Sequence, residues 1–270
     1  ALSGLQAHKR VIDVIGHNIS NVNTEGYSRR QVLLEPASGM KIASRFDTDF
    51  SWNNLGVNIA GVNRIRDQFL DVKARASLAS SASAARLDSV LGGVEGTFPE
   101  PSDTAIAGQL SAFWNAFSDA ANQPGSIPQR AAVLAQASNL AASLNQAAGS
   151  LQTQHADLSS QLTMGVDRVN TLAQQVADLN VQIRAASVAG MDTGDLADER
   201  DRLVDQLTSL TGAEVRPIEY NQVNVMLGGS SLVSAGRISP LKGTTSGAFP
   251  APPDQLQAQQ TQLQWADAGY

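Results

Sequence analysis

A stretch of about sixty residues without proline does most to restrict what this chain can fold into. It runs from Gln129 to about Ala189, and its interior glycines are Gly149 and Gly165. At 1.5 Å per residue, a continuous helix of this length would be roughly 90 Å long. Its clearest part carries a heptad pattern, typical of helices packed side by side, at Val169, Leu172, Val176, Leu179, Ile183 and Ala186.

Further helices are expected on both sides of this stretch. One runs from near Arg64 to the prolines that follow residue 98, and another opens at Ser102 or Asp103, both of which are suitable N-caps. A last helix ends at Gly212, and Arg200 interrupts its apolar face of Leu196, Leu203, Leu207 and Leu210. Hydrophobic residues make up 42% of the chain but aromatic residues only 5%, which favours long helices over one large compact core.

The first 22 residues carry a strict heptad seam, which Val11 and Val14 widen. A single helix of this length is unstable alone in water, so the seam requires a partner helix. We interpret His8 as a polar residue that sets the register of pairing rather than as a ligand. The helix is expected to end near Asn21, where turn-forming residues lead to Gly26. The seam consists of Leu5, His8, Ile12, Ile15, Ile19 and Val22.

Other segments lack helical periodicity. Between residues 27 and 62, the stretches 31–34 and 57–59 indicate short extended pieces, separated by turn formers at Gly39, Asn53, Asn54 and Gly56. After residue 212 the period changes to two, which predicts a hairpin that turns at Tyr220-Asn221 and a short strand at 232–233. Residues 240–254 contain four prolines and are typical of a linker, and the Gln-rich stretch 254–265 lacks an apolar stripe.

These patterns predict a mainly α protein with a β-rich part. Residues 1–62 are expected to form a coiled-coil-forming N-terminal helix and an irregular, extended arm. Residues 63–211 are expected to form a long antiparallel helical bundle. Residues 212–270 would begin a β-rich outer domain with a β-hairpin and a proline-rich linker. The chain starts without methionine and carries no second set of heptads to match the first, so we expect a fragment or a long missing tail.

Charge and cysteine content narrow the function classes. The chain has 19 Lys+Arg against 25 Asp+Glu, a net charge of −6, which argues against nucleic-acid binding. It has no cysteine, which excludes disulfides, thiolate metal sites and a cysteine nucleophile. No run of 18 apolar residues occurs, so membrane insertion is not expected.

No catalytic, cofactor or metal site is predicted. Asp192-Thr193-Gly194 spells the aspartic-protease tripeptide, but it occurs once and between two helices, so we interpret it as a turn. The acidic cluster around it does not have the ligand spacing of a calcium loop. Asp195 and Asp198 are better explained as negative charges that interact favourably with the positive, N-terminal end of the last helix.

One segment resembles a known family. Residues 15–29 are similar to the signature "N-N-I-(A/S)-N-x-N-T-x-G-Y" that closes the N-terminal helix of bacterial flagellar rod, hook and hook-associated subunits, with His17 in place of the first Asn. Later motifs resemble the hook-associated junction proteins of this family rather than its rod and hook subunits. They are Gly61-Val62-x-Arg64-x-Arg66-Asp67-x-Phe69-Leu70, Leu110-x-x-Phe113-Trp114-x-Ala116-Phe117, Arg130-x-x-Val133-Leu134, Asn180-x-x-Ile183 and Asp198-x-Arg200-Asp201-x-Leu203-Val204-x-x-Leu207.

The resemblance implies a structural subunit without enzymatic activity or cofactor, which self-assembles at the distal end of the hook and joins it to the filament. Its implied partners are identical subunits in a ring, the hook protein, a second hook-associated junction protein and a cytoplasmic export chaperone. It implies an extracellular place in the flagellum, reached by flagellar export without a cleaved signal peptide. The residues expected to carry assembly are Leu5, His8, Ile12, Ile15, Asn18, Ile19, Asn21, Val22, Gly26 and Tyr27.

Three other hypotheses stay open at this point. A distal rod or hook axial protein is the near alternative, but it would carry β-rich domains where helices are predicted here. A coiled-coil signalling module would need a membrane span. An enzyme displayed on the flagellum would need a catalytic cluster.

Overall fold

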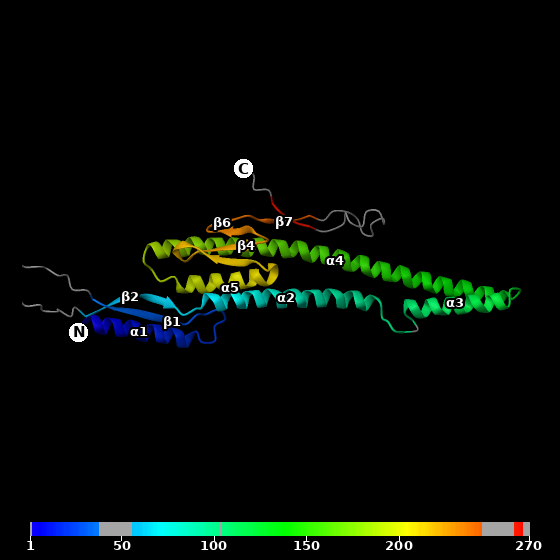
Figure 1. Cartoon of the computed structure of the whole chain (residues 1–270), viewed down its shortest axis with the longest axis horizontal. Coiled ribbons are helices and arrows are strands. Elements are labelled where there is room, and N and C mark those ends of the chain that lie inside the picture. The colour runs from blue at the N-terminus through cyan, green and yellow to red at the C-terminus, as the bar shows by residue number, and fades with distance from the viewer. Residues whose placement is uncertain (1, 38–55, 103, 245–261, 267–270) are drawn as a thin grey trace, which may run out of the picture. The chain divides into compact units, whose positions relative to one another are not determined.

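The computed structural model describes residues 2–37, 56–102, 104–244 and 262–266. The helices are α1 (Leu2–Ser20), α2 (Gln68–Thr97), α3 (Ile106–Asn122), α4 (Ile127–Val188) and α5 (Gly194–Thr211), and most of the strands follow α5 (Figure 1). The expected fold class, mainly α with a β-rich part, is confirmed. The chain divides into two compact units, residues 1–80 with 169–240 and residues 81–168 with 241–270.

In the first unit, α1 lies along an antiparallel pair of strands (Figure 1). These strands, β1 (Arg30–Pro36) and β2 (Val57–Arg64), confirm the extended pieces at 31–34 and 57–59 and are called the arm below. Helix α1 contacts both arm strands and buries Ala7 and Val14. Val14 therefore packs inward, and the expectation that it widens the exposed seam is wrong. The turn formers expected at 39, 53 and 54 lie outside the described residues.

The core of the first unit combines the C-terminal part of α4, α5 and the strands that follow. The heptad pattern of α4 is buried here from Val169 onward, except that Leu179 is half-buried and the neighbouring Asn180 is fully buried. The α4 pattern therefore marks a core face, as the sequence predicted. The largest fully buried apolar side chains are Ile183, Leu207, Leu232, Val176, Val204, Val225 and Val233.

The strands after α5 form an antiparallel sheet in the order β3 (Glu214–Pro217), β4 (Val223–Leu227), β5 (Ser230–Ser234) and β6 (Arg237–Ile238). The chain turns between β3 and β4 at Tyr220 and Asn221, whose φ angles are 55° and 57°, so the predicted hairpin is confirmed. Asn180 of α4 holds this sheet. Its amide nitrogen donates to the carbonyl oxygens of Val223 at 2.8 Å and Ala235 at 2.7 Å, and its oxygen accepts the Val223 N–H at 3.1 Å.

The ends of α2 and α5 have clear local causes. Helix α2 begins at Gln68 rather than near Arg64, because Arg64 still belongs to β2. The Asp67 carboxylate caps the new start by accepting the N–H groups of residues 69 and 70, at 2.9 and 3.2 Å. Helix α5 ends as predicted at Gly212, which has a φ of 70° and donates its N–H to the Thr208 carbonyl at 2.8 Å.

The second unit contains α3 and the N-terminal part of α4, together with the antiparallel pair β7 (Leu241–Thr244) and β8 (Gln262–Trp265). Helix α3 begins at Ile106, so the predicted opening at Ser102 is wrong; Ser102 Oγ instead accepts the Ala105 N–H at 3.1 Å in the turn before the helix. Position 103 lies outside the described residues. The predicted linker begins as β7, and the rest of it, with the Gln-rich stretch up to 261, is outside them.

Candidate assembly interface

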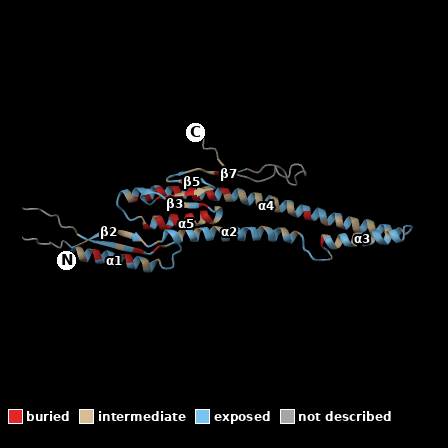
Figure 2. Cartoon of the chain, in the orientation of Figure 1, coloured by how far each residue is buried: buried red, intermediate tan, exposed pale blue. Residues whose placement is uncertain are grey.

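Helix α1 exposes the apolar face that the sequence analysis singled out. Its side chains are between 50% and 74% exposed, whereas the opposite face packs on the arm (Figure 2). His8 lies in the same line and is also exposed. An exposed apolar row of this length marks a surface that another element covers. We call it the α1 stripe: Leu5, Ile12, Ile15 and Ile19 of α1, with Val22 in the turn that follows.

A compact cap follows α1. The Asn21 side chain donates to the His17 carbonyl at 3.0 Å, and its oxygen accepts the Thr24 hydroxyl at 3.2 Å. The Tyr27 N–H then donates to the Thr24 carbonyl at 3.2 Å, which reverses the chain. Gly26 has a φ of 82°, a left-handed conformation that favours glycine, and a Cβ there would lie 3.4 Å from Cβ of Arg202 on α5. The cap therefore ends α1 close to α5.

Asn18 joins the last turn of α1 to the start of the arm. Its amide nitrogen donates to the carbonyl of Arg30 at 2.9 Å, and its oxygen accepts the N–H of the same residue at 3.0 Å. The Tyr27 hydroxyl donates to the same Asn18 oxygen at 2.8 Å, and His17 Nδ1 lies 3.3 Å from that hydroxyl. His17, the departure from the family signature, thus contacts Tyr27. The signature residues form one hydrogen-bonded cluster that attaches α1 to the arm.

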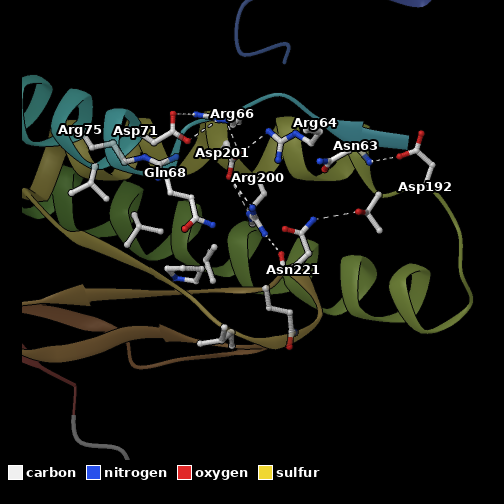
Figure 3. A pocket seen from close by; sticks show the side chains of 18 of the residues that line it. Asn63, Arg64, Arg66, Gln68, Asp71, Arg75, Asp192, Arg200, Asp201 and Asn221 are labelled. Atoms are coloured by element: carbon white, nitrogen blue, oxygen red, sulfur yellow. Dashed lines mark hydrogen bonds and ion pairs between the residues drawn. The ribbon is translucent and has the colours of Figure 1, made fainter. Parts of the chain in front are cut away.

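Arginines of the arm, of the link after it and of α2 meet aspartates of α5 in a row of ion pairs. Figure 3 shows the part of this row around Asp201. The aspartates lie three and four residues apart, so they share one face of α5. We call this the arginine–aspartate ladder. Its hydrogen bonds are Arg30 to Asp195, Arg30 Nη2 to Asp198 Oδ2 at 3.1 Å, Arg64 Nη2 to Asp198 Oδ1 at 2.6 Å and Asp201 Oδ2 at 2.7 Å, Arg66 Nη1 to Asp201 Oδ2 at 2.8 Å, and Arg75 Nε to Asp205 Oδ1 at 2.7 Å.

Arg200 belongs to this ladder rather than interrupting an apolar face. Its side chain is 4% exposed and donates to Asp201 Oδ1 at 2.9 Å and to the Asn221 carbonyl. Leu210, which was expected on the buried face of α5, is instead about half exposed. The role assigned to Asp198 from the sequence, as a charge at the helix start, is incomplete because its main partners are arm arginines.

The ion pairs shift the pKa values of Asp195, Arg30 and Asp201. The hydrogen bond from Arg30 lowers the pKa of Asp195 and outweighs its partial burial. Burial lowers the pKa of Arg30, but the hydrogen bonds to Asp195 and Asp198 outweigh burial, so that pKa is raised. Burial favours a higher pKa for Asp201, yet Arg200 and Arg64 outweigh it, and the pKa of Asp201 is lowered. These carboxylates therefore stay ionised near pH 7.

A cavity of about 640 Å³ lies beside the ladder, between residues 62–75, 192–201 and 215–223 (Figure 3). Its charged lining consists of arginines and aspartates, each of which already has an ion-pair partner. Within the described part of the chain, no group of histidines and carboxylates is arranged to hold a metal ion. Asp192 serves as a turn residue, since its Oδ1 accepts the Gly194 N–H at 2.9 Å. The arrangement suits a structural contact between segments.

Sequence reasoning missed the ladder, although some of its arginines and aspartates lie in two of the motifs that resemble the family. Arg64 and Arg66 lie in the first motif, and Asp198 and Asp201 lie in the last. Opposite charges at helical spacing in two distant motifs were the available signal. Arg30, which lies just after the family signature, had no such signal because its partners are more than 160 residues away.

Comparison with known proteins first defines the class. A family model described as flagella basal body rod protein matches residues 1–27, the segment that holds α1 and its cap. The chain is thus similar at its start to proteins of the flagellar axis. No helix among the described residues is both long enough and apolar enough to cross a lipid bilayer.

The family follows from the rest of the chain. The model of the flagellar hook-associated protein FlgK helical domain matches residues 91–269, which is more than half of the sequence, and the chain belongs to this family. It is 30% identical over 237 residues to flagellar hook-associated protein 1 of Bacillus subtilis, covering 87% of this chain and 45% of that protein. The Salmonella typhimurium protein of the same name is 27% identical over 253 residues, covering 93% and 44%.

A solved structure gives the same result. The flagellar hook junction protein FlgK from Burkholderia pseudomallei superposes with a TM-score of 0.51 at 26% identity, covering 65% of this chain and 30% of that one. A shorter match, 34% identical over 74 residues, links 25% of the chain to 17% of the flagellar hook protein FlgE of Borreliella burgdorferi. The chain spans less than half the length of the curated relatives that it matches.

Proposed function

We propose that this chain is the helical part of a structural subunit that assembles at the distal end of the flagellar hook and joins hook to filament. The observation that carries the proposal is the α1 stripe, an apolar row left exposed by a helix whose other face packs on the arm. An assembly subunit needs such a surface for a partner helix. Membership of the FlgK family supports the place of assembly.

The stripe can supply useful association energy. Fully burying an isoleucine side chain is worth about 1.5–3 kcal/mol. Ile15 is 50% exposed and Ile19 is 68% exposed, so burying the exposed part of both side chains against a partner helix contributes about 2–3 kcal/mol. This corresponds to an increase in association constant on the order of 100-fold for each subunit contact.

Each part of the chain has a separate role in this proposal. Residues 1–62 supply the axial helix and arm, with His8 setting the register of pairing and the cap from Asn18 to Tyr27 determining where the arm departs. Residues 63–211 supply the bundle that contacts adjacent subunits, and residues 212–270 begin an outer domain. The subunit carries out no catalysis and uses no cofactor. Its partners are identical subunits in a ring, the hook protein, a second hook-associated junction protein and an export chaperone.

We infer that the subunit reaches its place outside the cell through the flagellar export pathway, without a cleaved signal peptide. The absence of cysteine in the 270 residues suits a chain that is exported unfolded. A distal rod or hook protein is the less favoured function, since the hook-protein match covers only a quarter of the chain.

The test replaces Ile15→Asp and Ile19→Asp together in the full-length protein. Both side chains are exposed in the isolated chain, so the helical signal in circular dichroism and the melting temperature should not change. Incorporation at hook tips and filament growth should be lost, because two charges would enter an apolar interface.

A matched control changes Gln6→Asp and Lys9→Gln, which alters the net charge equally at exposed positions of α1 off the stripe. This control should assemble normally. Normal hook–filament junctions built from the Ile15→Asp and Ile19→Asp protein would refute the proposed function.

A further inference from the structure

Asp198 of α5 accepts hydrogen bonds from both strands of the arm. Its Oδ2 accepts a hydrogen bond from Arg30 of β1 at 3.1 Å, and its Oδ1 accepts one from Arg64 of β2 at 2.6 Å. Arg30 and Arg64 lie directly opposite each other in the register of the two strands. The Asp198 side chain is only 10% exposed, so water screens these contacts weakly.

We propose that Asp198, Arg30 and Arg64 form a two-point clamp that sets the direction of α1 relative to α5. This inference rests on the proposed function, because the direction of α1 is also the direction in which the α1 stripe meets its partner. Without Asp198, Arg30 would keep only partners that water screens, since Asp192 is 33% and Asp195 75% exposed, while Arg64 would keep the buried Asp201. One buried attachment leaves the arm free to pivot about Arg64, whereas two buried attachments on adjacent strands prevent this rotation. Asp198 is a positioning residue in this view.

The connection from Arg30 to α1 is direct. Asn18 in the last turn of α1 holds the backbone of Arg30 through both its N–H and its carbonyl, at 3.0 and 2.9 Å. The Tyr27 ring lies 5.4 Å from the Arg30 guanidinium carbon, and the Tyr27 hydroxyl donates to Asn18 at 2.8 Å. A displacement of Arg30 is therefore passed on to the end of α1.

The Arg30 side chain lies in a confined space. It is 6% exposed, and Gly194 lies directly beside it. A Cβ at position 194 would lie 2.6 Å from both Cζ and Nε of Arg30, closer than atoms can approach. A glycine at the start of α5 is thus what admits the guanidinium between the cap and α5. This feature offers a way to displace Arg30 without changing any charge.

The test measures the direction of α1 in unassembled full-length protein. Spin labels are attached at Lys9→Cys on α1 and Gln182→Cys on α4, two exposed positions in the first unit of a segment that has no cysteine of its own. Double electron–electron resonance spectroscopy then gives the distribution of distances between the two labels. The parent protein should show one narrow peak, and Asp198→Asn should lose it in favour of a broad distribution.

Two further variants make the result specific. Asp205→Asn removes a carboxylate on the same helix that pairs with Arg75 of α2 rather than with the arm, and it should keep the narrow peak. Gly194→Ala keeps every charge but displaces Arg30, so it should broaden the distance distribution. It tests the clamp in place of Asp198→Asn if that variant does not fold. A narrow peak in a folded Asp198→Asn variant, or in Gly194→Ala if that variant alone folds, overturns the clamp. Assembly by the stripe variants would refute the proposed function instead, because the clamp is measured before assembly.

Discussion

Replacing Asp201 by asparagine tests how far the arginine–aspartate ladder stabilises the first unit. The Asp201 carboxylate accepts hydrogen bonds from Arg64, Arg66 and Arg200, and its side chain is 10% exposed. Asn has nearly the same shape, so the substitution removes the charge without leaving a cavity. The amide group also turns N–H donors toward arginines, which can only donate.

Most of the loss in stability on replacing Asp201 is expected to come from its partner Arg200. Arg64 still pairs with Asp198, and Arg66 still pairs with Asp71 at 2.8 Å. Arg200 keeps only the Asn221 carbonyl as a partner outside its own ion pair, and it is 4% exposed. Breaking a buried ion pair from one side costs about 3–5 kcal/mol. Because two of the arginines keep a partner, we expect a loss of about 3 kcal/mol in the free energy of unfolding.

Urea unfolding followed by far-UV circular dichroism measures this loss. Asp195→Asn is the control, since its carboxylate is 75% exposed and should cost less than about 1 kcal/mol although it also pairs with an arginine. Changing Arg200→Met with Asp201→Leu should recover much of the stability, because two apolar side chains replace a buried pair. An Asp201→Asn loss no larger than that of Asp195→Asn would refute the reasoning.

Three further predictions concern the same unit. The melting temperature should fall as the pH drops through about 4 and below, because the pKa of Asp201 is lower in the folded chain than its unfolded value of about 3.9, and protonation removes its stabilising charge. An equally steep dependence of melting temperature on pH in Asp201→Asn would contradict this. In denaturant titrations, Val14→Ala should cost about 1–3 kcal/mol and Ile12→Ala less than about 0.5, the reverse order excluding the packing described for α1. Gly26→Ala should lower stability by about 1–2 kcal/mol through its positive φ, and calorimetry showing no change would disprove the strain.

Local pattern was sufficient for most of the fold. The proline-free stretch became α4, the change of period after Gly212 became the sheet, and the dense turn formers after α1 became its cap. These features depend on residues a few positions apart, where spacing and backbone preference act directly. The exposed α1 stripe was predictable for the same reason, since a heptad seam is a property of one helix.

Contacts across the chain could not be predicted in this way. Val14 turns inward because the arm folds back along α1, and nothing within residues 1–22 specifies that neighbour. Arg200 looked like a defect in an apolar face until the fold placed it against Asp201 and the Asn221 carbonyl.

The sequence by itself determined where the helices and the β-rich part lie and which face of α1 stays apolar. Only the tertiary structure decided that Arg30 and Arg64 meet Asp198, and therefore how α1 is attached. The physical reason is range. Helix periodicity acts over a few residues, whereas an ion pair between residues more than 130 positions apart forms only once the chain has brought the two segments together.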